Sequence, residues 1–190
     1  MLDVPKTEVD WQRWLVEKIR SSCGNPDSLS TIPVKTLTNE SSIGSLCGTF
    51  DYDVFEDTSF WNHQREVSDK HNVLMDISGG MTPDIVLRSG KSGQNRIYIE
   101  VKEKAKLSYG IYDSQVVRYF LHLLATSKST KMQPYSELRR AIILAAPDYW
   151  FDNAKLVEPW HDFCKRYAGL AEAFDVTLGE IRLNDKLLRT

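Results

Sequence analysis

Two carboxylates and one lysine form the clearest chemical pattern in the chain. Asp84 follows Pro83 at the start of an apolar segment, and Glu100 and Lys102 lie at the end of the next one, after a spacer of fifteen residues. Side chains alternate between the two faces of a strand, so Glu100 and Lys102 point the same way. If the two segments pair as neighbouring strands, Asp84 comes within reach of Glu100. We therefore expect the three side chains to meet.

Two carboxylates brought together need a compensating charge. At a separation of about 4 Å and an effective dielectric constant near 20, they repel by roughly 4 kcal/mol. Such a site either protonates one acid or holds a cation, and oxygen ligands favour Mg²⁺ or Mn²⁺ over zinc. We expect Asp84, Glu100 and the main-chain carbonyl of Val101 to hold the ion, which would polarise a phosphate. Lys102 would stabilise the charge that develops on the phosphoryl group or help to orient the attacking water.

The elements that position these residues are predicted from periodicity and turn signals. Thr7 and Asp10 predict the start of a helix, whose apolar residues recur at four-residue spacing until Gly24 ends it. The strands that follow are joined closely, which favours an antiparallel meander. A helix with Val116 and Phe120 on its apolar face comes next. The predicted strands cover residues 72–78, 84–88, 96–102, 140–146 and 176–183.

The second half of the chain predicts a buried strand and a further helix. Residues 140–146 are apolar on both sides, as parallel strands tend to be. Pro159 is expected to begin the last helix. The apolar face expected for that helix consists of Trp160, Phe163, Cys164, Tyr167 and Leu170.

The segment at about 25–71 gives a weaker pattern. Residues 25–48 are rich in Ser, Thr, Asn, Pro and Gly, which is typical of a loop with room for one short strand. Residues 49–71 carry aromatic side chains among many charges. They fit a short helix over the core, a substrate-facing insertion or a dimer contact. We treat 25–71 as an insertion of uncertain structure in a single domain that spans residues 1–190.

The motif as a whole resembles the signature of the PD-(D/E)XK nuclease superfamily. Pro83-Asp84, the spacer, and the triplet that begins at Glu100 match that signature, and the predicted order of helix, three strands, helix and strand is similar to the family core. The resemblance covers roughly residues 8–20 and 72–146. It implies an α/β, restriction-endonuclease-like fold, with a mixed central sheet flanked by helices.

Residues on two helices extend the resemblance. Gln115 and Tyr119, at positions i and i+4 of the helix after Lys102, resemble the Gln-x-x-x-Tyr motif of the RecB-like branch, whose helix leans over the active site. The family also implies an added metal ligand from a first-helix glutamate, for which Glu17 is the candidate. His63 or His71 could reach the metal site from the insertion. The four-cysteine iron–sulfur cage of many RecB-like exonucleases has no counterpart among three dispersed cysteines.

The resemblance implies a divalent-metal-dependent nuclease that hydrolyses phosphodiester bonds of DNA or RNA, with an endonuclease favoured. The alternative is a catalytically inactive nucleic-acid-binding or assembly module of the same fold. An unrelated α/β interaction domain, in which the charged residues are coincidental, is a third hypothesis. A homodimer, or a place in a larger nucleic-acid-processing assembly, is expected from the habits of the superfamily and from the aromatic-rich segment 49–71.

Composition sets the remaining expectations. Residues 88–140 hold eleven basic and four acidic side chains, a charge of +7, against −2 for the whole chain, which would attract a polyanion if the basic groups share a face. No apolar run approaches the length of a membrane span, so no membrane partner is expected. Scattered cysteines and the absence of a secretory signal favour a reducing compartment, cytoplasmic or nuclear.

Overall fold

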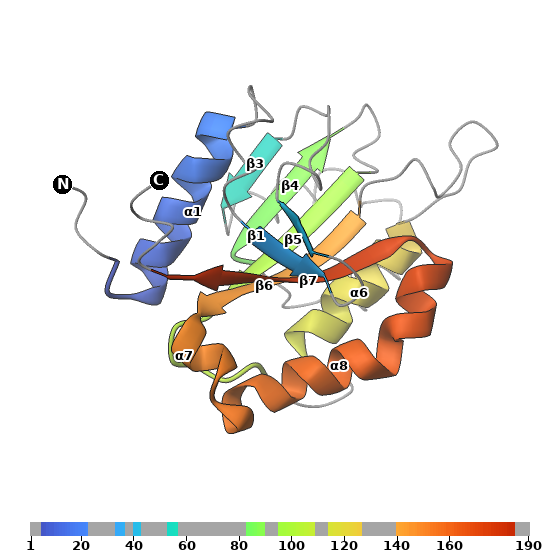
Figure 1. Ribbon diagram of the computed structural model, residues 1–190. Coiled ribbons are helices and arrows are strands. Elements are labelled where there is room, and N and C mark those ends of the chain that lie inside the picture. Colours follow the sequence, from blue (N-terminus) through green and yellow to red (C-terminus); the bar gives the residue numbers. More distant parts are fainter. Residues whose placement is uncertain are drawn as a thin grey trace.

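A computed structural model of the chain shows an α/β architecture built on one seven-stranded sheet (Figure 1). It describes residues 5–22, 33–36, 40–42, 53–56, 83–89, 95–108, 114–126 and 140–184. The helices are α1 (Glu8–Ser22), α6 (Gln115–Thr126), α7 (Asp148–Phe151) and α8 (Ala154–Ala173). The strands are β1 (Pro33–Thr36), β2 (Glu40–Ser42), β3 (Asp53–Glu56), β4 (Ile85–Ser89), β5 (Asn95–Val101), β6 (Arg140–Pro147) and β7 (Val176–Leu183).

The sheet is mixed, with strand order β2-β1-β7-β6-β5-β4-β3. Strands β5, β6 and β7 are parallel to one another, whereas β3, β4 and β5 form an antiparallel meander. Strand β1 adds to the far side of β7 in the antiparallel sense, and β2 pairs with β1. Every residue of the central strand β6 is buried, as its apolar sequence predicts.

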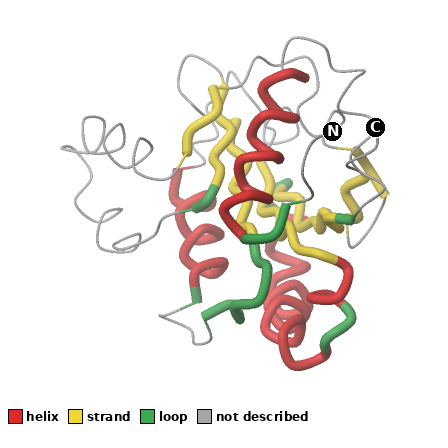
Figure 2. Tube along the Cα trace, turned by 90° about the vertical axis from the view of Figure 1, so that its left-hand side faces the viewer, coloured by secondary structure: helices red, strands yellow, loops and turns green. Residues whose placement is uncertain are grey.

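Helices cover both faces of the sheet, and each face has its own apolar cluster. Helix α1 supplies residues such as Leu15 to the cluster that contains Ile97, Ile99 and Val101 of β5. Phe120 of α6 and Trp160 of α8 join the cluster on the opposite face, which contains Tyr98. Figure 2 looks onto α1, with the strands behind it. The alternation of side chains along β5 therefore decides which helix each residue meets.

The start of α1 is fixed by a reciprocal pair of hydrogen bonds. The main-chain N–H of Asp10 donates to Thr7 Oγ1 at 3.2 Å, and the N–H of Thr7 donates to Asp10 Oδ2 at 3.1 Å. The arrangement resembles a capping box with aspartate in place of glutamate, and it satisfies main-chain donors that the first turn leaves unpaired. The predicted helix start is thus confirmed.

The predicted strands downstream of residue 84 are confirmed, with ends that differ by no more than one residue, and so is the helix expected after Lys102. The predicted strand at 72–78 lies outside the described residues. The strand that pairs with the free side of β4 is β3, which comes from the segment that we treated as an insertion. That segment also supplies β1 and β2, so it contributes to both edges of the sheet.

The helix expected from Pro159 begins earlier, and this prediction was wrong. Helix α8 begins at Ala154, because the Asn153 side chain accepts a hydrogen bond from the N–H of Lys155 and caps the helix, and Pro159 lies inside it. The apolar face of α8 also differs from the prediction at its C-terminal end. Leu170 is 41% exposed, while Ala171 is buried.

No helix in the part of the chain that the structure describes has the length and apolar character needed to cross a membrane.

The early start of α8 predicts that Asn153 stabilises the fold. Replacing it with Ala removes the cap and should lower the free energy of unfolding by about 1 kcal/mol, as measured by urea denaturation. Asn153→Asp keeps a side-chain acceptor and should stay close to wild type. An Asn153→Ala variant as stable as wild type would favour a helix that begins near Pro159.

Candidate active site

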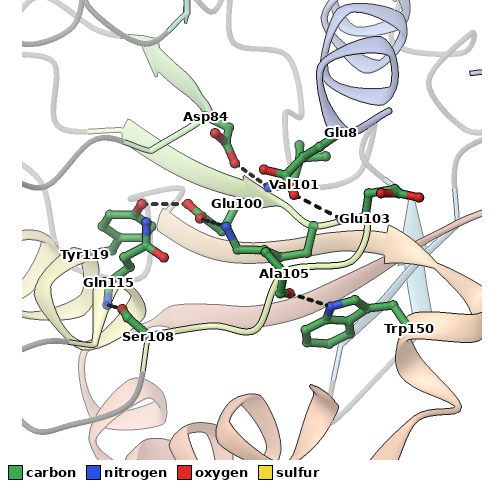
Figure 3. A network of polar contacts seen from close by, with 11 residues as sticks. Glu8, Asp84, Glu100, Val101, Glu103, Ala105, Ser108, Gln115, Tyr119 and Trp150 are labelled. Atoms are coloured by element: carbon green, nitrogen blue, oxygen red, sulfur yellow. Dashed lines mark hydrogen bonds and ion pairs between the residues drawn. The ribbon is translucent and has the colours of Figure 1, made fainter. Parts of the chain in front are cut away.

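The candidate site lies at one end of the sheet, where β5 finishes and β4 begins. Ile85 of β4 pairs with Ile99 of β5 in the antiparallel register, so the next pair along the strands places Asp84 opposite Glu100. The first turn of α1 and the start of α6 lie at the same end of the sheet (Figure 3). The carboxyl ends of parallel strands, such as β5 and β6, are common locations for ligand sites.

Glu100 is the most deeply buried charged group of the site, with 1% of its surface exposed. Its Oε1 atom lies 2.6 Å from the ammonium nitrogen of Lys102, and its Oε2 atom accepts a hydrogen bond of 2.6 Å from the Tyr119 hydroxyl. Burial raises the pKa of Glu100 above its ordinary value, while Lys102 and Tyr119 oppose that rise. The carboxylate is therefore held by one cation and one phenol, both of which are buried.

Asp84 accepts a hydrogen bond from the main chain of the neighbouring strand. Its Oδ2 atom lies 2.7 Å from the N–H of Val101, and its own carbonyl accepts a hydrogen bond of 2.8 Å from the Gln12 side chain of α1. Burial, followed by the negative charge of Glu100, raises the pKa of Asp84 from 3.8 to about 7, against the opposing effect of the Val101 hydrogen bond. Near neutral pH this carboxyl exchanges readily between its protonated and ionised forms.

Lys102 remains a cation in spite of its burial. Only 7% of the residue is exposed, and burial alone would lower the pKa of its ammonium group. The negative charges of Glu100, Glu8 and Asp84 outweigh that effect and raise the pKa above its ordinary value. The main-chain N–H of Lys102 donates to the carbonyl of Ala145 at 2.8 Å, which continues the pairing of β5 with β6 past the end of the strand.

Tyr119 and Gln115 come from α6 and lie beside Glu100 (Figure 3). Tyr119 is fully buried, and burial together with the charge of Glu100 raises its pKa, so its hydroxyl stays protonated and remains a donor. Gln115 is the first residue of α6, and its main-chain N–H donates to the Ser108 hydroxyl at 3.1 Å. The i and i+4 spacing thus brings both side chains toward one region of the site.

A second buried pair supports Tyr119 from behind. The rings of Tyr98 and Tyr119 meet edge to face, with centroids 5.9 Å apart. The Tyr98 hydroxyl lies 2.7 Å from Nδ1 of His122, which is itself buried. Burial lowers the pKa of His122 to about 3, so the imidazole is neutral at physiological pH. The hydrogen bond to His122 therefore holds the Tyr98 ring in the position where it packs against Tyr119.

Glu8, not Glu17, is the first-helix acid that lies at the site. Its Oε2 atom accepts a hydrogen bond of 3.1 Å from the N–H of Glu103, and its charge contributes to the raised pKa values of Asp84 and Glu100. Glu17 is exposed, and nine residues at 3.6 residues per turn carry it to the opposite side of α1. The structure therefore does not bring Glu17 together with the other candidate residues.

The sequence signal for Glu8 is easily overlooked. Acidic residues are common in the first turn of any helix because they complement its dipole, and Asp10 shares that position. The distinguishing feature of Glu8 is a contact with a residue 95 positions away, which periodicity does not reveal. The histidines suggested as further ligands, His63 and His71, lie outside the described residues.

The chemistry of the donors fits a hard divalent cation. The side chains of the site that could bind a metal, Asp84, Glu100 and Glu8, are all carboxylates, and the repulsion from Glu100 and Glu8 contributes to the raised pKa of Asp84. Relief of that repulsion favours a bound cation with oxygen ligands. Within the described ranges, no three His, Cys, Asp or Glu side chains are already spaced to hold a metal. Glu100 instead has Lys102 as its cationic partner.

No protein-family model, curated protein or solved structure matches this chain. A function is therefore inferred from the geometry and electrostatics of the site.

The raised pKa of Asp84 predicts a specific dependence of stability on pH. Because the folded-state pKa of about 7 exceeds the ordinary value of 3.8, the folded protein favours the protonated carboxyl, and stability is lost as the pH rises through 7. Asparagine cannot ionise but can still accept the Val101 hydrogen bond. In the presence of chelator, Asp84→Asn should equal wild type near pH 4 and exceed its free energy of unfolding by roughly 1–3 kcal/mol at pH 8.

Asp10 provides the control for this measurement. The Thr7 hydrogen bond lowers the pKa of Asp10, so ionisation of this carboxyl stabilises the fold, and Asp10→Asn should lose stability relative to wild type as the pH rises. Equal pH profiles for the wild type and Asp84→Asn would show that Asp84 does not titrate in a buried, acidic environment.

Proposed function

We propose that this chain is a divalent-metal-dependent nuclease that hydrolyses phosphodiester bonds of DNA or RNA as an endonuclease, on a restriction-endonuclease-like core. The observation that carries the proposal is the convergence of Asp84, Glu100 and Lys102 at one end of the sheet, with both acids shifted toward higher pKa. The order of α1, the antiparallel strands ending in β5, then α6 and the parallel strand β6 supports membership of the PD-(D/E)XK superfamily.

The residues that would hold Mg²⁺ or Mn²⁺ are Asp84 and Glu100, together with the carbonyl of Val101 and the nearby carboxylate of Glu8. When bound, the ion would polarise the phosphoryl group and lower the pKa of the attacking water. The protein residues determine the position of the bound ion. Asp84 is tied to β5 through the Val101 N–H, so the two acids keep a constant relation across the paired strands.

Lys102 supplies positive charge for the reaction. Its raised pKa keeps the ammonium protonated at neutral pH, and it can donate hydrogen bonds to phosphoryl oxygens as negative charge develops on them. Water attacks phosphorus, the bond to the leaving oxygen breaks, and that oxygen takes up a proton. Tyr119 orients Glu100 throughout, because its hydroxyl remains a donor. No covalent intermediate with the protein is required.

One observation favours the alternative of an inactive nucleic-acid-binding or assembly module. Both oxygens of Glu100 already have buried partners, as they would in a purely structural ion pair. Against this, a structural pair of Glu100 and Lys102 needs no further acids, yet Asp84 lies beside it, and the charges of Glu100 and Glu8 add to the raised pKa of Asp84. Such repulsion between carboxylates destabilises the fold. A cation that binds in the site would compensate it, which favours a metal-binding role for these acids.

Activity is tested on single- and double-stranded DNA and RNA with Mg²⁺, Mn²⁺ or chelator. We expect cleavage only with metal, and a loss of at least about a hundredfold in rate for Asp84→Asn, Glu100→Gln and Lys102→Ala. Lys165→Ala, which removes an exposed lysine of α8, is the control and should retain wild-type activity. Cleavage that persists in excess chelator, or in Lys102→Ala, would contradict the proposed mechanism.

Metal binding is tested without any substrate. Mn²⁺ should raise the melting temperature of the wild type by a few degrees, because a ligand that binds the folded state stabilises it. Glu100→Gln and Glu8→Gln should reduce that increase, whereas Glu17→Gln should leave it unchanged, since Glu17 is exposed on the far side of α1. An equal response in the Glu8 and Glu17 variants would remove Glu8 from the set of metal ligands.

A further inference from the structure

An exposed tyrosine lies directly beside the proposed active site. Tyr149 of α7 is 53% exposed, and its hydroxyl donates a hydrogen bond of 2.8 Å to Oε1 of Glu103, the residue that follows Lys102. The main chain of Glu103 in turn contacts Glu8. One residue therefore separates the exposed aromatic ring from the groups that we assign to phosphodiester hydrolysis.

A lysine accompanies the ring. The ammonium nitrogen of Lys104 lies 3.0 Å from the same Oε1 atom of Glu103 that Tyr149 contacts, so the phenol and the ammonium are neighbours. The Lys104 side chain is 78% exposed, and Lys106 is exposed as well. An accessible cation next to an accessible aromatic ring is the combination that proteins use to bind single-stranded nucleic acid.

An open pocket extends from Tyr149 on α7 to the start of α8. It has a volume of about 660 Å³ and is lined by Tyr149, Asp152, Asn153, Ala154 and Lys155. All five lining residues are exposed, so the pocket is a shallow depression open to solvent, and Lys155 adds a third exposed cation after Lys104 and Lys106. We name the residues Lys104, Tyr149, Asn153 and Lys155 the Tyr149 surface.

The acidic residues near the Tyr149 surface have basic partners. Arg182 Nη1 lies 3.7 Å from Asp148 Oδ1 and 3.5 Å from Asp152 Oδ1, and Glu103 pairs with Lys104. These pairs offset the negative charge that would otherwise repel a phosphate backbone. The segment that carries Lys104 is also fixed in place, because Trp150 donates a hydrogen bond of 2.9 Å to the carbonyl of Ala105 (Figure 3).

We infer that the Tyr149 surface binds an unpaired stretch of the nucleic-acid substrate, with a base stacked on the Tyr149 ring and the adjoining phosphate next to Lys104. The inference rests on the proposed function and names its substrate class as single-stranded DNA or RNA, or a single-stranded region beside the scissile bond. A base within a duplex is covered on both faces by its neighbours and cannot stack on a side chain.

Binding is measured by fluorescence anisotropy with the full chain in excess chelator, so that no cleavage is involved. The probes are a labelled oligothymidylate of about twelve nucleotides, within the range of known single-strand site sizes, an abasic strand of the same length and a blunt duplex. Tyr149→Ala should weaken binding of the oligothymidylate by about tenfold, the effect expected for one stacked base. Tyr149→Phe keeps the ring and should bind within about twofold of wild type.

Matched controls separate stacking from general effects. Leu170→Ala removes an exposed apolar side chain near the other end of α8 and should leave binding unchanged. The abasic strand and the duplex should bind wild type and Tyr149→Ala equally. Lys104→Ala should lower the slope of log affinity against log salt concentration by about one, whereas Lys165→Ala should not change it.

The inference is overturned if the wild type does not bind the oligothymidylate, if Tyr149→Ala binds it like wild type, or if the variant loses affinity equally for all three probes. The two proposals fail separately. Binding that depends on Tyr149 without cleavage under any metal would overturn the nuclease and keep the single-strand site. Metal-dependent cleavage, together with single-strand binding that does not change in Tyr149→Ala, would overturn the single-strand site and keep the nuclease.

Discussion

The burial of like charges at one end of the sheet is the constraint on which the candidate site depends. Glu100 lies in the protein interior with Asp84 opposite it and Glu8 nearby, and a carboxylate in such a place is unstable unless a cation or a proton compensates it. Lys102 provides the cation in the described structure, at 2.6 Å from Glu100. Glu8 belongs to α1, Asp84 directly precedes β4 and Glu100 belongs to β5, so the spacing of the three acids depends on how those elements pack.

The alternation of side chains along β5 serves the core and the site together. Ile97, Ile99 and Val101 face α1 and belong to one apolar cluster, while Tyr98 belongs to the cluster on the opposite face. Glu100 follows the same alternation as Tyr98, which directs it toward α6 and the Tyr119 hydroxyl. A shift of β5 by one residue would therefore exchange core residues for charged ones and destroy both arrangements.

The part of the site that strand geometry controls could be predicted from the sequence. Parity along residues 96–102 and the pairing of that strand with Asp84 were sufficient to expect that Asp84, Glu100 and Lys102 meet. Tyr119 was expected beside them only from the resemblance to the Gln-x-x-x-Tyr motif. The first-helix acid was not predictable in the same way. The position of Glu8 depends on how α1 is rotated and shifted against the sheet, which is set by contacts between distant residues.

The edge strands were also beyond the reach of local patterns. Strands β1, β2 and β3 have three or four residues each, too few for alternation to stand out from a segment rich in turn-forming residues. Strand β1 pairs with β7 and β3 pairs with β4, both far away in the sequence, and β2 pairs with β1. The start of α8 was missed for a related reason, because Pro159 is a familiar helix-start signal and the cap at Asn153 outweighs it.

The hydrogen bond from the Lys102 main chain to Ala145 has a consequence for motion at the site. It anchors the Cα atom of Lys102 to the rigid centre of the sheet, although the residue lies one position past the end of β5. Any movement of the ammonium group away from Glu100 is therefore a change of the Lys102 side-chain rotamer, while the Cα atom stays in place. Rotamer changes are far faster than rearrangements of a loop, so exchange of the ammonium between a carboxylate and another anion does not require the backbone to move.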